Sequence, residues 1–464
     1  MVNDFQSTVY GDFAADYESN RLADICNRKD GVQTGPFGSQ LHQEDYVLEG
    51  TPIITVEHLD DNRILHSDVP CVSEKDCKRL CKYSLLKGDI VFSRVGSVDR
   101  RALVRDEENG WLFSGRCLRV RPNKEIIDPR YLSYFFGLPS FKEHIRAIAV
   151  GATMPSLNTK ILSDVIIYYP PLPEQRAIAH ILGTLDDKIE LNRQMNETLE
   201  AMARAIFKSW FVDFDPVRAK AEGRDTGLPE EIAELFPDSF EETEMGEVPK
   251  GWQVKKIQEV VKCIKGKSYK SEHLQESQTA LVTLKSFARG GGYRADGLKA
   301  YTGDYKPEQI VQPGELVIAC TDVTQAAEVI GRPAIVESSD KFSIMIASLD
   351  VLIVRPSVKN ITVPFLYCLF KTDRFADHTY AHSTGTTVLH LSKEAVPSYK
   401  FACPPEELHK RFASLTIPIF TRIDTIEQES RTLAELRDTL LPKLISGELR
   451  IKDAGEIIGN VPVE

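Results

Sequence analysis

The strongest constraint on the fold is an internal repeat, in which the second half of the chain matches the first. Gly151-Ala-Thr-Met-Pro-Ser-Leu157 aligns with Gly385-Thr-Thr-Val-Leu-His-Leu391, and at the same spacing of 234 positions Pro170-Pro171 aligns with Pro404-Pro405. Further upstream the spacing shortens slightly, as expected when loops differ in length. Because the repeated unit is half of the 464-residue chain, the sequence predicts two tandem modules rather than a solenoid of short repeats.

Each module divides into two physically different parts. The first part consists of short runs with strand-like patterns, such as Thr51–Val56, Asp89–Phe92 and Leu118–Val120, broken by Gly, Asn, Asp and Pro. This pattern predicts a β-rich domain. The second part of the first module runs from Glu174 to about Phe211, with a helical pattern. The predicted fold class is therefore α+β, with a β-rich domain and then a long helix in each copy.

Both predicted helices carry one continuous apolar stripe, with spacings of mostly three and four residues. In the first copy the stripe is formed by Ile178, Ile181, Leu185, Ile189, Met195, Leu199, Met202 and Ile206 and ends at Trp210 and Phe211. In the second copy it is formed by Leu415, Ile419, Ile423, Ile426, Leu433, Leu436 and Leu440. A helix of roughly 37 residues is about 55 Å long, and two such helices can bury their stripes against each other. We expect an antiparallel intramolecular coiled coil, in which Pro418 starts, kinks or interrupts the second helix. Two separate helices docked on their own domains are the alternative.

Charge and hydropathy narrow the classes of protein that this chain can belong to. The net charge is −11, from 57 Lys and Arg against 68 Asp and Glu, so a uniformly basic nucleic-acid coat protein is excluded. Eight acidic residues and no basic ones lie in 228–249, which we interpret as a solvated linker or a short acidic helix. We expect a cytoplasmic protein, because there is no secretory signal pattern, no membrane-length apolar run and no paired cysteine motif.

Several catalytic motifs begin in this sequence and are not completed. Gly266-Lys267-Ser268 resembles the end of a phosphate-binding loop, but the first glycine of that motif is replaced by Val261. His378 and His382 have the spacing of a zinc-binding helix, but Thr379 stands where the glutamate would be. We therefore predict no catalytic residue, no metal site and no cofactor in this chain, and favour a binding or assembly protein.

Polar residues suited to phosphate or base contacts are found on loops of both modules. Glycines let the backbone approach a ligand closely, and arginine makes bidentate contacts with phosphate or guanine. In the first module the candidate DNA-binding residues are Gln33, Thr34, Phe37, Ser39, Gln40, Arg94, Arg100, Arg101 and Thr153. In the second they are Lys265, Lys267, Tyr269, Lys270, Lys285, Arg289, Arg294, Thr386 and Thr387. Each of these residues is also common on protein surfaces, so the prediction of DNA binding depends on their recurrence in both modules.

Several segments, in this order, resemble the specificity subunits of type I restriction-modification enzymes. In the first variable domain these are Gly35-Pro-Phe-Gly-Ser39 and Gly88-Asp-Ile-Val-Phe-Ser-Arg94. The first helical region begins near Pro170-Pro-Leu-Pro-Glu-Gln-Arg176 and closes at Trp210-Phe-Val-Asp-Phe-Asp-Pro216. Pro249-Lys-Gly-Trp252 opens the second module, and the chain ends in a segment that includes Leu440-Leu-Pro-Lys-Leu-Ile-Ser-Gly447. The second copy departs from the first after Pro405 and lacks the Phe-Asp-Pro segment, so we expect the two recruiting surfaces to differ.

The resemblance implies a division of labour between this chain and its partners. Two target recognition domains would each read one half of a split sequence in double-stranded DNA, and the coiled coil would hold them apart. The apolar positions Ile181, Leu185, Ile189, Leu199, Ile206, Trp210, Phe211, Ile423, Leu433 and Leu440 would serve the coiled coil and partner contacts. The subunit would not be catalytic. It would recruit modification subunits, expected to be two, that methylate adenine with S-adenosylmethionine, and restriction subunits that use ATP and Mg²⁺ to translocate and cut DNA.

The expected boundaries follow from the repeat and from the resemblance together. Target recognition domain 1 would occupy 1–170, a central helical region 171–227, the acidic linker 228–249, target recognition domain 2 250–403, and a C-terminal helical region 404–464. The competing hypothesis is a duplicated coiled-coil adaptor that clamps proteins and does not read DNA. Salt-dependent DNA binding separates the two, because phosphate contacts release counterions.

Overall fold

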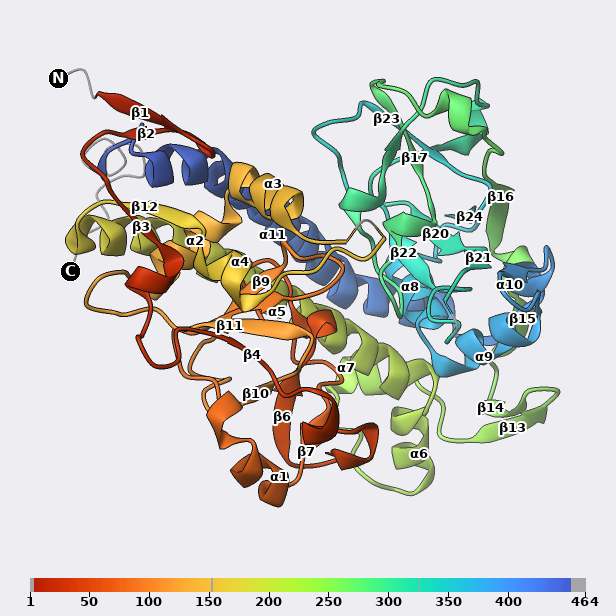
Figure 1. Cartoon of the computed structure of the whole chain (residues 1–464). Coiled ribbons are helices and arrows are strands. Elements are labelled where there is room, and N and C mark those ends of the chain that lie inside the picture. Colours follow the sequence, from red (N-terminus) through yellow and green to blue (C-terminus); the bar gives the residue numbers. More distant parts are fainter. Residues whose placement is uncertain (1–3, 152, 325, 452–464) are drawn as a thin grey trace. The chain divides into compact units, whose positions relative to one another are not determined.

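The fold is described from a computed structural model, which covers residues 4–151, 153–324 and 326–451 (Figure 1). The chain forms two compact units, one made of Met1–Leu191 with Glu429–Glu464 and the other of Asn192–Gln428. Each unit combines one β-rich module with part of each long helix. The units thus group the segments differently from the five consecutive regions expected from the sequence.

The first unit contains two four-stranded sheets, covered by short helices. One sheet has the antiparallel order β4-β11-β8-β9. Every residue of β8 and β11 is buried, which explains why these two strands are mainly apolar. The other sheet has the order β10-β6-β7-β5 and includes the parallel pair β6–β10. The elements are β1 (Phe5–Thr8), β2 (Gly11–Ala14), β3 (Glu18–Arg21), β4 (Val32–Thr34), β5 (Tyr46–Val47), β6 (Thr51–Ile54), β7 (Cys71–Val72), α1 (Glu74–Arg79), β8 (Ile90–Ser93), β9 (Arg101–Leu103), β10 (Leu112–Phe113), β11 (Cys117–Val120), α2 (Pro129–Gly137), α3 (Pro139–Ile148), α4 (Thr159–Ser163) and β12 (Ile166–Tyr169).

The second unit repeats this plan. Its sheet β16-β24-β20-β22 corresponds to β4-β11-β8-β9, and its parallel pair β17–β23 corresponds to β6–β10. The elements are α6 (Asp215–Ala221), α7 (Glu230–Ala233), β13 (Phe240–Thr243), β14 (Gly246–Pro249), β15 (Gln253–Lys256), β16 (Val261–Lys265), β17 (Thr279–Val282), β18 (Lys299–Ala300), β19 (Ile310–Val311), β20 (Leu316–Ala319), β21 (Thr321–Asp322), β22 (Pro333–Ile335), β23 (Ile344–Ala347), β24 (Val351–Pro356), α8 (Val363–Phe370), α9 (Asp373–Ala381), β25 (Ser383–Thr384), β26 (Leu389–Leu391), α10 (Ala395–Ser398) and β27 (Lys400–Cys403).

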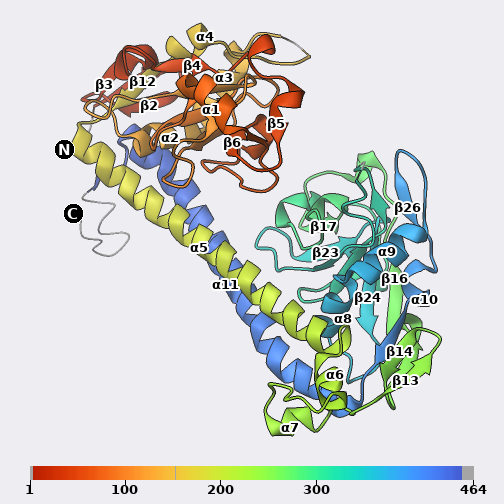
Figure 2. The same cartoon turned by 90° about the horizontal axis from the view of Figure 1, so that it is seen from below.

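The two predicted long helices are α5 (Leu172–Phe211) and α11 (Glu406–Ser446) (Figure 2). They pack in antiparallel fashion within each unit. In the first unit the Asp186 carboxylate meets the Arg437 guanidinium at 2.8 Å. In the second unit Asn196 donates to Glu427, and the Phe207 ring lies 5.8 Å from that of Phe412. The expected antiparallel pairing of the two helices is therefore confirmed.

Most of the predicted stripe faces the packed side of the helices. Ile181, Leu185, Trp210, Phe211 and Leu440 are buried, whereas Ile189, Leu199, Ile206, Ile423 and Leu433 are half-buried. Met202 was assigned to the stripe wrongly, because its side chain is exposed and the neighbouring Ala203 is buried in its place. The small side chain of Ala203 lets the aromatic side chains in the core of the second unit approach the helix.

The expected interruption at Pro418 is wrong. Helix α11 continues through this residue, which lies on the exposed side of the helix. Proline removes one backbone donor and displaces the carbonyl four residues before it. On a solvent-facing side water can satisfy that carbonyl, so the helix tolerates the residue.

The acidic segment 228–249 is a folded part of the second unit, which corrects its interpretation as a solvated linker. Only α7 matches the short acidic helix, and the hairpin β13–β14 follows it. Phe236 and Val248 are buried in the aromatic core of this unit. The hairpin is the repeat of β1–β2, since Thr8 and Thr243 each donate to a glycine carbonyl three residues ahead, at 2.7 and 2.8 Å.

The part of the chain that the structure describes includes no helix that is both long and apolar enough to cross a membrane.

Candidate nucleic-acid interface

Three loops of the first module meet at one end of the sheet that contains β8. Arg94 is central to the arrangement, because its amide donates to the Arg116 carbonyl at 2.8 Å and its carbonyl accepts from the Leu157 amide at 2.8 Å. The Gly96 amide donates to the Pro155 carbonyl at 2.9 Å. We term this arrangement loop cluster 1. It is formed by three loops, residues 35–40, 94–100 and 150–157 without 152, together with the turn 114–116 between β10 and β11. The structure thus brings together three segments that the sequence analysis selected independently.

Arg94 and Phe37 form a stacked pair on loop cluster 1, in which Arg94 is half-buried and Phe37 is exposed. The Arg94 guanidinium carbon lies 4.6 Å from the centre of the Phe37 ring, and Phe37 is 48% exposed. One terminal nitrogen, Nη1, donates to the Gly115 carbonyl at 3.2 Å. The ring and the carbonyl hold the guanidinium plane at the surface. An arginine ordered in this way loses less entropy on meeting a phosphate or a guanine than a mobile one.

Glycine is required where the loops of the cluster cross. A Cβ on Gly35 would lie 2.2 Å from the Ser114 carbonyl oxygen, so any side chain here would force the strands apart. Gly151 has a φ of +108° in the third loop, and a Cβ there would meet the Met154 carbonyl oxygen at 2.8 Å. Both positions therefore fix backbone paths that expose the neighbouring side chains.

The second module repeats these contacts at equivalent positions. A Cβ on Gly266 would lie 2.0 Å from the Ser348 carbonyl oxygen, as at Gly35. The Leu391 amide donates to the Cys320 carbonyl at 2.8 Å, which reproduces the bond between Leu157 and Arg94. Loop cluster 2 is formed by residues 266–270, 320–324 and 384–391. Gly385, with a φ of +119°, takes the place of Gly151.

The basic residues of loop cluster 2, and Lys265 directly before it at the end of β16, differ in their surroundings. Lys265 and Lys270 are exposed, and Lys270 forms an ion pair with Glu272 at 3.4 Å. Lys267 is half-buried, and its backbone amide donates to the Ala347 carbonyl at 2.8 Å. Tyr269 is also half-buried, and burial raises its pKa. The residues aligned with Arg94 and Phe37 are Cys320 and Ser268, so the second cluster has no equivalent of that stacked pair.

Arg101 was predicted to contact DNA, and the structure corrects this. Its side chain is 3% exposed, Nε donates to the Ser133 carbonyl at 2.8 Å, and the guanidinium is paired with Asp61. Burial by itself would raise the pKa of Asp61, but Arg101 and Lys142 outweigh it and lower that pKa to about 2. Arg101 therefore joins β9 to α2, whereas Arg100 next to it is exposed.

The glycine loop between Arg289 and Arg294 contacts the segment that follows loop cluster 2, because the Gly290 amide donates to the Glu328 carbonyl at 2.9 Å and the Glu328 amide donates to Thr324 Oγ1 at 3.0 Å. Lys371 donates to the Gly290 carbonyl at 3.1 Å and pairs with Glu200 of α5 at 3.3 Å, so this loop is tied to the helices. Arg289 pairs with Glu328 at 3.3 Å. Arg294 pairs with Asp296, and Lys285 is exposed at the start of the preceding turn.

The remaining predicted residues fall into two groups. Gln40 has a structural contact, because its side-chain oxygen accepts from the Tyr83 hydroxyl at 2.6 Å, and Gln33 and Thr34 are half-buried in β4. Three threonines are exposed in the glycine turns, namely Thr153, Thr386 and Thr387. The side chain of Ser39 lies outside the described residues.

One exposed residue of loop cluster 1 was missed in the sequence. Arg116 lies in the turn between β10 and β11, and its carbonyl accepts from the Arg94 amide. The signal was the turn sequence Ser114-Gly-Arg116 between two apolar runs. Only the pairing of β11 with β8 shows that this turn lies beside Arg94.

One group of potential metal ligands was found among the described residues, formed by His66, Glu107 and Glu108. Glu108 already has two structural contacts, since it accepts from the Arg105 amide at 2.7 Å and meets His66 Nε2 at 2.7 Å. These bonds fix the turn before β10 and account for the buried carboxylate without an ion.

Comparison with known proteins places the chain in a family. The sequence profile of the type I restriction modification DNA specificity domain matches twice, over residues 15–201 and 249–436. The chain therefore belongs to the family of type I restriction-modification specificity subunits and carries two of these domains.

Relatives agree with this assignment over nearly the whole chain. The HindI specificity subunit of Haemophilus influenzae is 26% identical over 436 residues, which cover 84% of this chain and 92% of the relative. The MjaIX specificity subunit of Methanocaldococcus jannaschii is 25% identical and covers 97% of each chain. The fold is similar to the crystal structure of a type I S subunit from M. genitalium, with a TM-score of 0.52 at 16% identity over 92% of this chain and 96% of that one.

Proposed function

We propose that this chain is the non-catalytic DNA-recognition subunit of a type I restriction-modification complex, with each loop cluster reading one half of a bipartite target. The observation that supports this most strongly is the repetition of the loop cluster. Gly35 and Gly266, and Gly151 and Gly385, create the same close backbone approaches in both modules. The side chains on these loops differ between the modules, as expected if the two domains share a scaffold and read different bases.

The chemistry of the first cluster suits contact with DNA. Arg94 is an ordered guanidinium on an exposed aromatic ring, and Arg100 and Arg116 are exposed on the same cluster. Guanidinium groups bind phosphates and the major-groove edge of guanine. The chain as a whole is acidic, so we infer that binding depends on local charge and on positive charge from partner subunits.

The long helices would set the distance between the half-sites and recruit the modification subunits, of which we propose two. Helix α5 has 40 residues and α11 has 41, and both are continuous in the structure. S-adenosylmethionine, ATP and Mg²⁺ would be bound by the modification and restriction subunits.

Salt dependence tests DNA recognition against the adaptor hypothesis. The complex with modification subunits should bind duplex DNA with an affinity that falls linearly with salt on logarithmic axes. Replacing Arg94 by Ala should reduce the slope by about one while assembly of the complex is unchanged. Stable assembly with no salt-dependent binding of DNA would support the adaptor instead.

Paired deletions test the role of the helices. Removing seven residues within 190–200 and seven within 424–434 shortens each helix by about 10 Å and keeps the heptad spacing of the stripe. We expect the preferred spacer to shorten by about three base pairs, with both half-sites unchanged. A control deletion in the exposed turn 222–226 should leave the spacer as it is. An unchanged spacer in the paired deletion would refute the helices as a ruler.

A further inference from the structure

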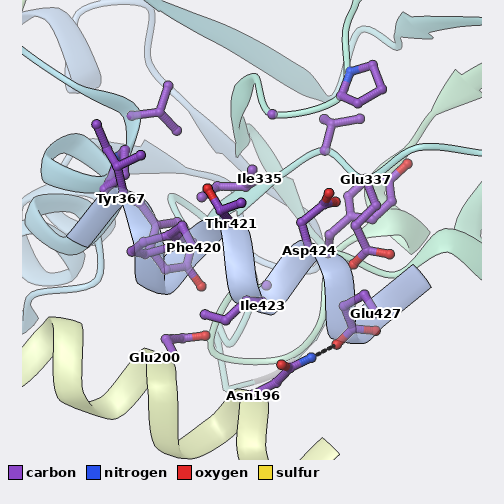
Figure 3. A pocket seen from close by; sticks show the side chains of 18 of the residues that line it. Asn196, Glu200, Ile335, Glu337, Tyr367, Phe420, Thr421, Ile423, Asp424 and Glu427 are labelled. Atoms are coloured by element: carbon purple, nitrogen blue, oxygen red, sulfur yellow. Dashed lines mark hydrogen bonds between the residues drawn. The ribbon is translucent and has the colours of Figure 1, made fainter. Parts of the chain in front are cut away.

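A groove of about 540 Å³ lies within the second unit, beside both long helices (Figure 3). Its walls come from α5, from α11 and from loops of the second β-rich module. It is separate from loop cluster 2, because none of the residues of that cluster lines it. The groove therefore needs an explanation other than DNA readout by the loops.

The floor of the groove is apolar. The rings of Tyr367 and Phe420 lie 5.5 Å apart in an edge-to-face arrangement, and Ile335 lies beside them in Figure 3. Ile417 on α11 also lines the groove and is 47% exposed. The exposed Ile417 and the half-buried Phe420 provide apolar surface that a partner side chain can cover, whereas Tyr367 is buried beneath it.

The rim of the groove carries an excess of negative charge. Five carboxylates line it, from Glu197, Glu200, Glu337, Asp424 and Glu427. The arginine among the described lining residues, Arg193, is paired with Glu197, and Lys371 offsets Glu200 at 3.3 Å. Carboxylates thus outnumber basic side chains among the described lining residues, and such an excess repels DNA phosphates and attracts lysine and arginine.

Asn196 provides a separate indication of a ligand. Its side chain is 8% exposed and Nδ2 donates to Glu427 Oε1 at 2.5 Å. The other amide atom, Oδ1, is buried and accepts no hydrogen bond from the described residues. Figure 3 shows this amide at the edge of the groove that Glu427 forms. A buried acceptor without a donor is unfavourable, and a lysine or arginine entering here could supply the donor.

The repeat supplies an internal comparison. A cavity of about 390 Å³ lies at the equivalent place in the first unit, with Gly88 in the position of Gly314 and Val104 in that of Val336. Its charges are balanced, with four basic residues against four acidic ones. Arg105 pairs with Asp187 across it at 3.1 Å. The acidic excess is therefore a property of the second unit and does not follow from the shared fold.

We propose that this groove, termed the acidic groove, binds a basic amphipathic segment of a partner protein. An aliphatic or aromatic side chain of the segment would cover Ile417 and Phe420, and its lysines or arginines would meet Asp424 and Glu427. The C-terminal residues 452–464 of this chain are a poor match for an acidic groove, because they contain three acidic residues and only one lysine. The inference rests on the proposed function only in the choice of modification subunits as the partner to test.

Charge reversal on α11 tests the proposal in the reconstituted complex with modification subunits. Thr421 and Asp424 are both exposed, so Thr421→Lys with Asp424→Lys should leave the chain folded. We expect assembly to weaken at least 10-fold at low salt, with a smaller loss at high salt. Asp424→Asn, a milder change, should weaken assembly by about 2–3-fold. The matched control is Asp106→Lys, an exposed acid of the balanced cavity, for which assembly should change less than 2-fold.

Photo-crosslinking identifies the occupant. A benzophenone amino acid in place of Ile417 should crosslink to a partner segment with an excess of Lys and Arg. Unchanged assembly of the charge-reversed variant, or a crosslink to DNA or to a segment without excess positive charge, would overturn the acidic groove as a docking site. Failure of the proposed function is distinguishable, since the complex would then assemble through the groove and still bind all DNA sequences equally.

Discussion

The buried ion pair between the long helices of the first unit offers a quantitative test of how the helix pair is held. Asp186 on α5 is nearly buried, with one oxygen 2.8 Å from Arg437 Nη1 on α11 and the other accepting from the Tyr134 hydroxyl at 2.7 Å. Burial by itself would lower the pKa of Arg437, but the hydrogen bond and charge of Asp186 raise it. The carboxylate therefore connects α5, α11 and α2.

The expected effect of Asp186→Ala follows from this geometry. Removing one partner of a buried pair leaves an uncompensated charge, which typically costs about 3–5 kcal/mol. Arg437 would keep its ion pair with the exposed Asp438 at 2.8 Å, and its side chain is 22% exposed, so we expect the lower end, about 3 kcal/mol. Replacing both partners by apolar residues, with Asp186→Leu and Arg437→Met, should cost much less than the sum of the single changes.

Hydrogen exchange measures this effect within one unit of a two-unit chain. A loss of about 3 kcal/mol in opening free energy corresponds to roughly 100-fold faster exchange in peptides from 172–191. The control is Lys188→Gln, which removes a more exposed ion pair to Glu429 across the same helices, at 3.3 Å. We expect it to change exchange by less than about 5-fold. Equal effects of Asp186→Ala and Lys188→Gln, or strict additivity of the double variant, would refute the reasoning.

Two further predictions separate recognition from folding. Arg94→Ala should relax or weaken only the first half-site with unchanged thermal stability. Arg101→Met should destabilise the chain by roughly 2–3 kcal/mol, because it removes the buried guanidinium that pairs with Asp61 and donates to the Ser133 carbonyl. Melting curves and half-site mapping test both, and a readout loss confined to Arg101→Met would reverse the assignment. His409 is 2% exposed, and burial, with Lys255, lowers its pKa to about 4. The unfolded chain therefore binds a proton near pH 6.5 and the folded chain does not, so about 2 kcal/mol should be lost between pH 6.5 and 5; urea unfolding of His409→Gln should lack this loss, and an unchanged slope would contradict it.

The large-scale plan could be predicted because the repeat and the apolar stripes are periodic features. The glycine turns at Gly151 and Gly385 were also visible, since small residues recur there at one spacing. The hairpin β13–β14 was missed because eight carboxylates dominate its region, and only Phe240, Thr243 and Gly246 match Phe5, Thr8 and Gly11 of β1–β2. Local composition concealed a structural repeat that rests on three residues.

Individual site residues depended on contacts between distant segments. Arg100 and Arg101 are neighbours in sequence, but only Arg101 meets Asp61 and the Ser133 carbonyl, which lie about 30 to 40 positions away. The sequence therefore could not show which arginine is buried. Arg116 was missed for the opposite reason, because its place beside Arg94 depends on how β11 pairs with β8. The acidic groove likewise needs α5, α11 and the sheet loops to be assembled before its charge is visible.

Mapping methylated bases in DNA from cells that express the complete system tests the central claim most directly. Our account predicts a split motif of two short half-sites with an unspecified spacer. Exchanging residues 266–270 and 384–391 for those of a related subunit should change one half-site and leave the other half-site and the spacer intact. A single continuous motif, or a change in both half-sites after this exchange, would contradict the account.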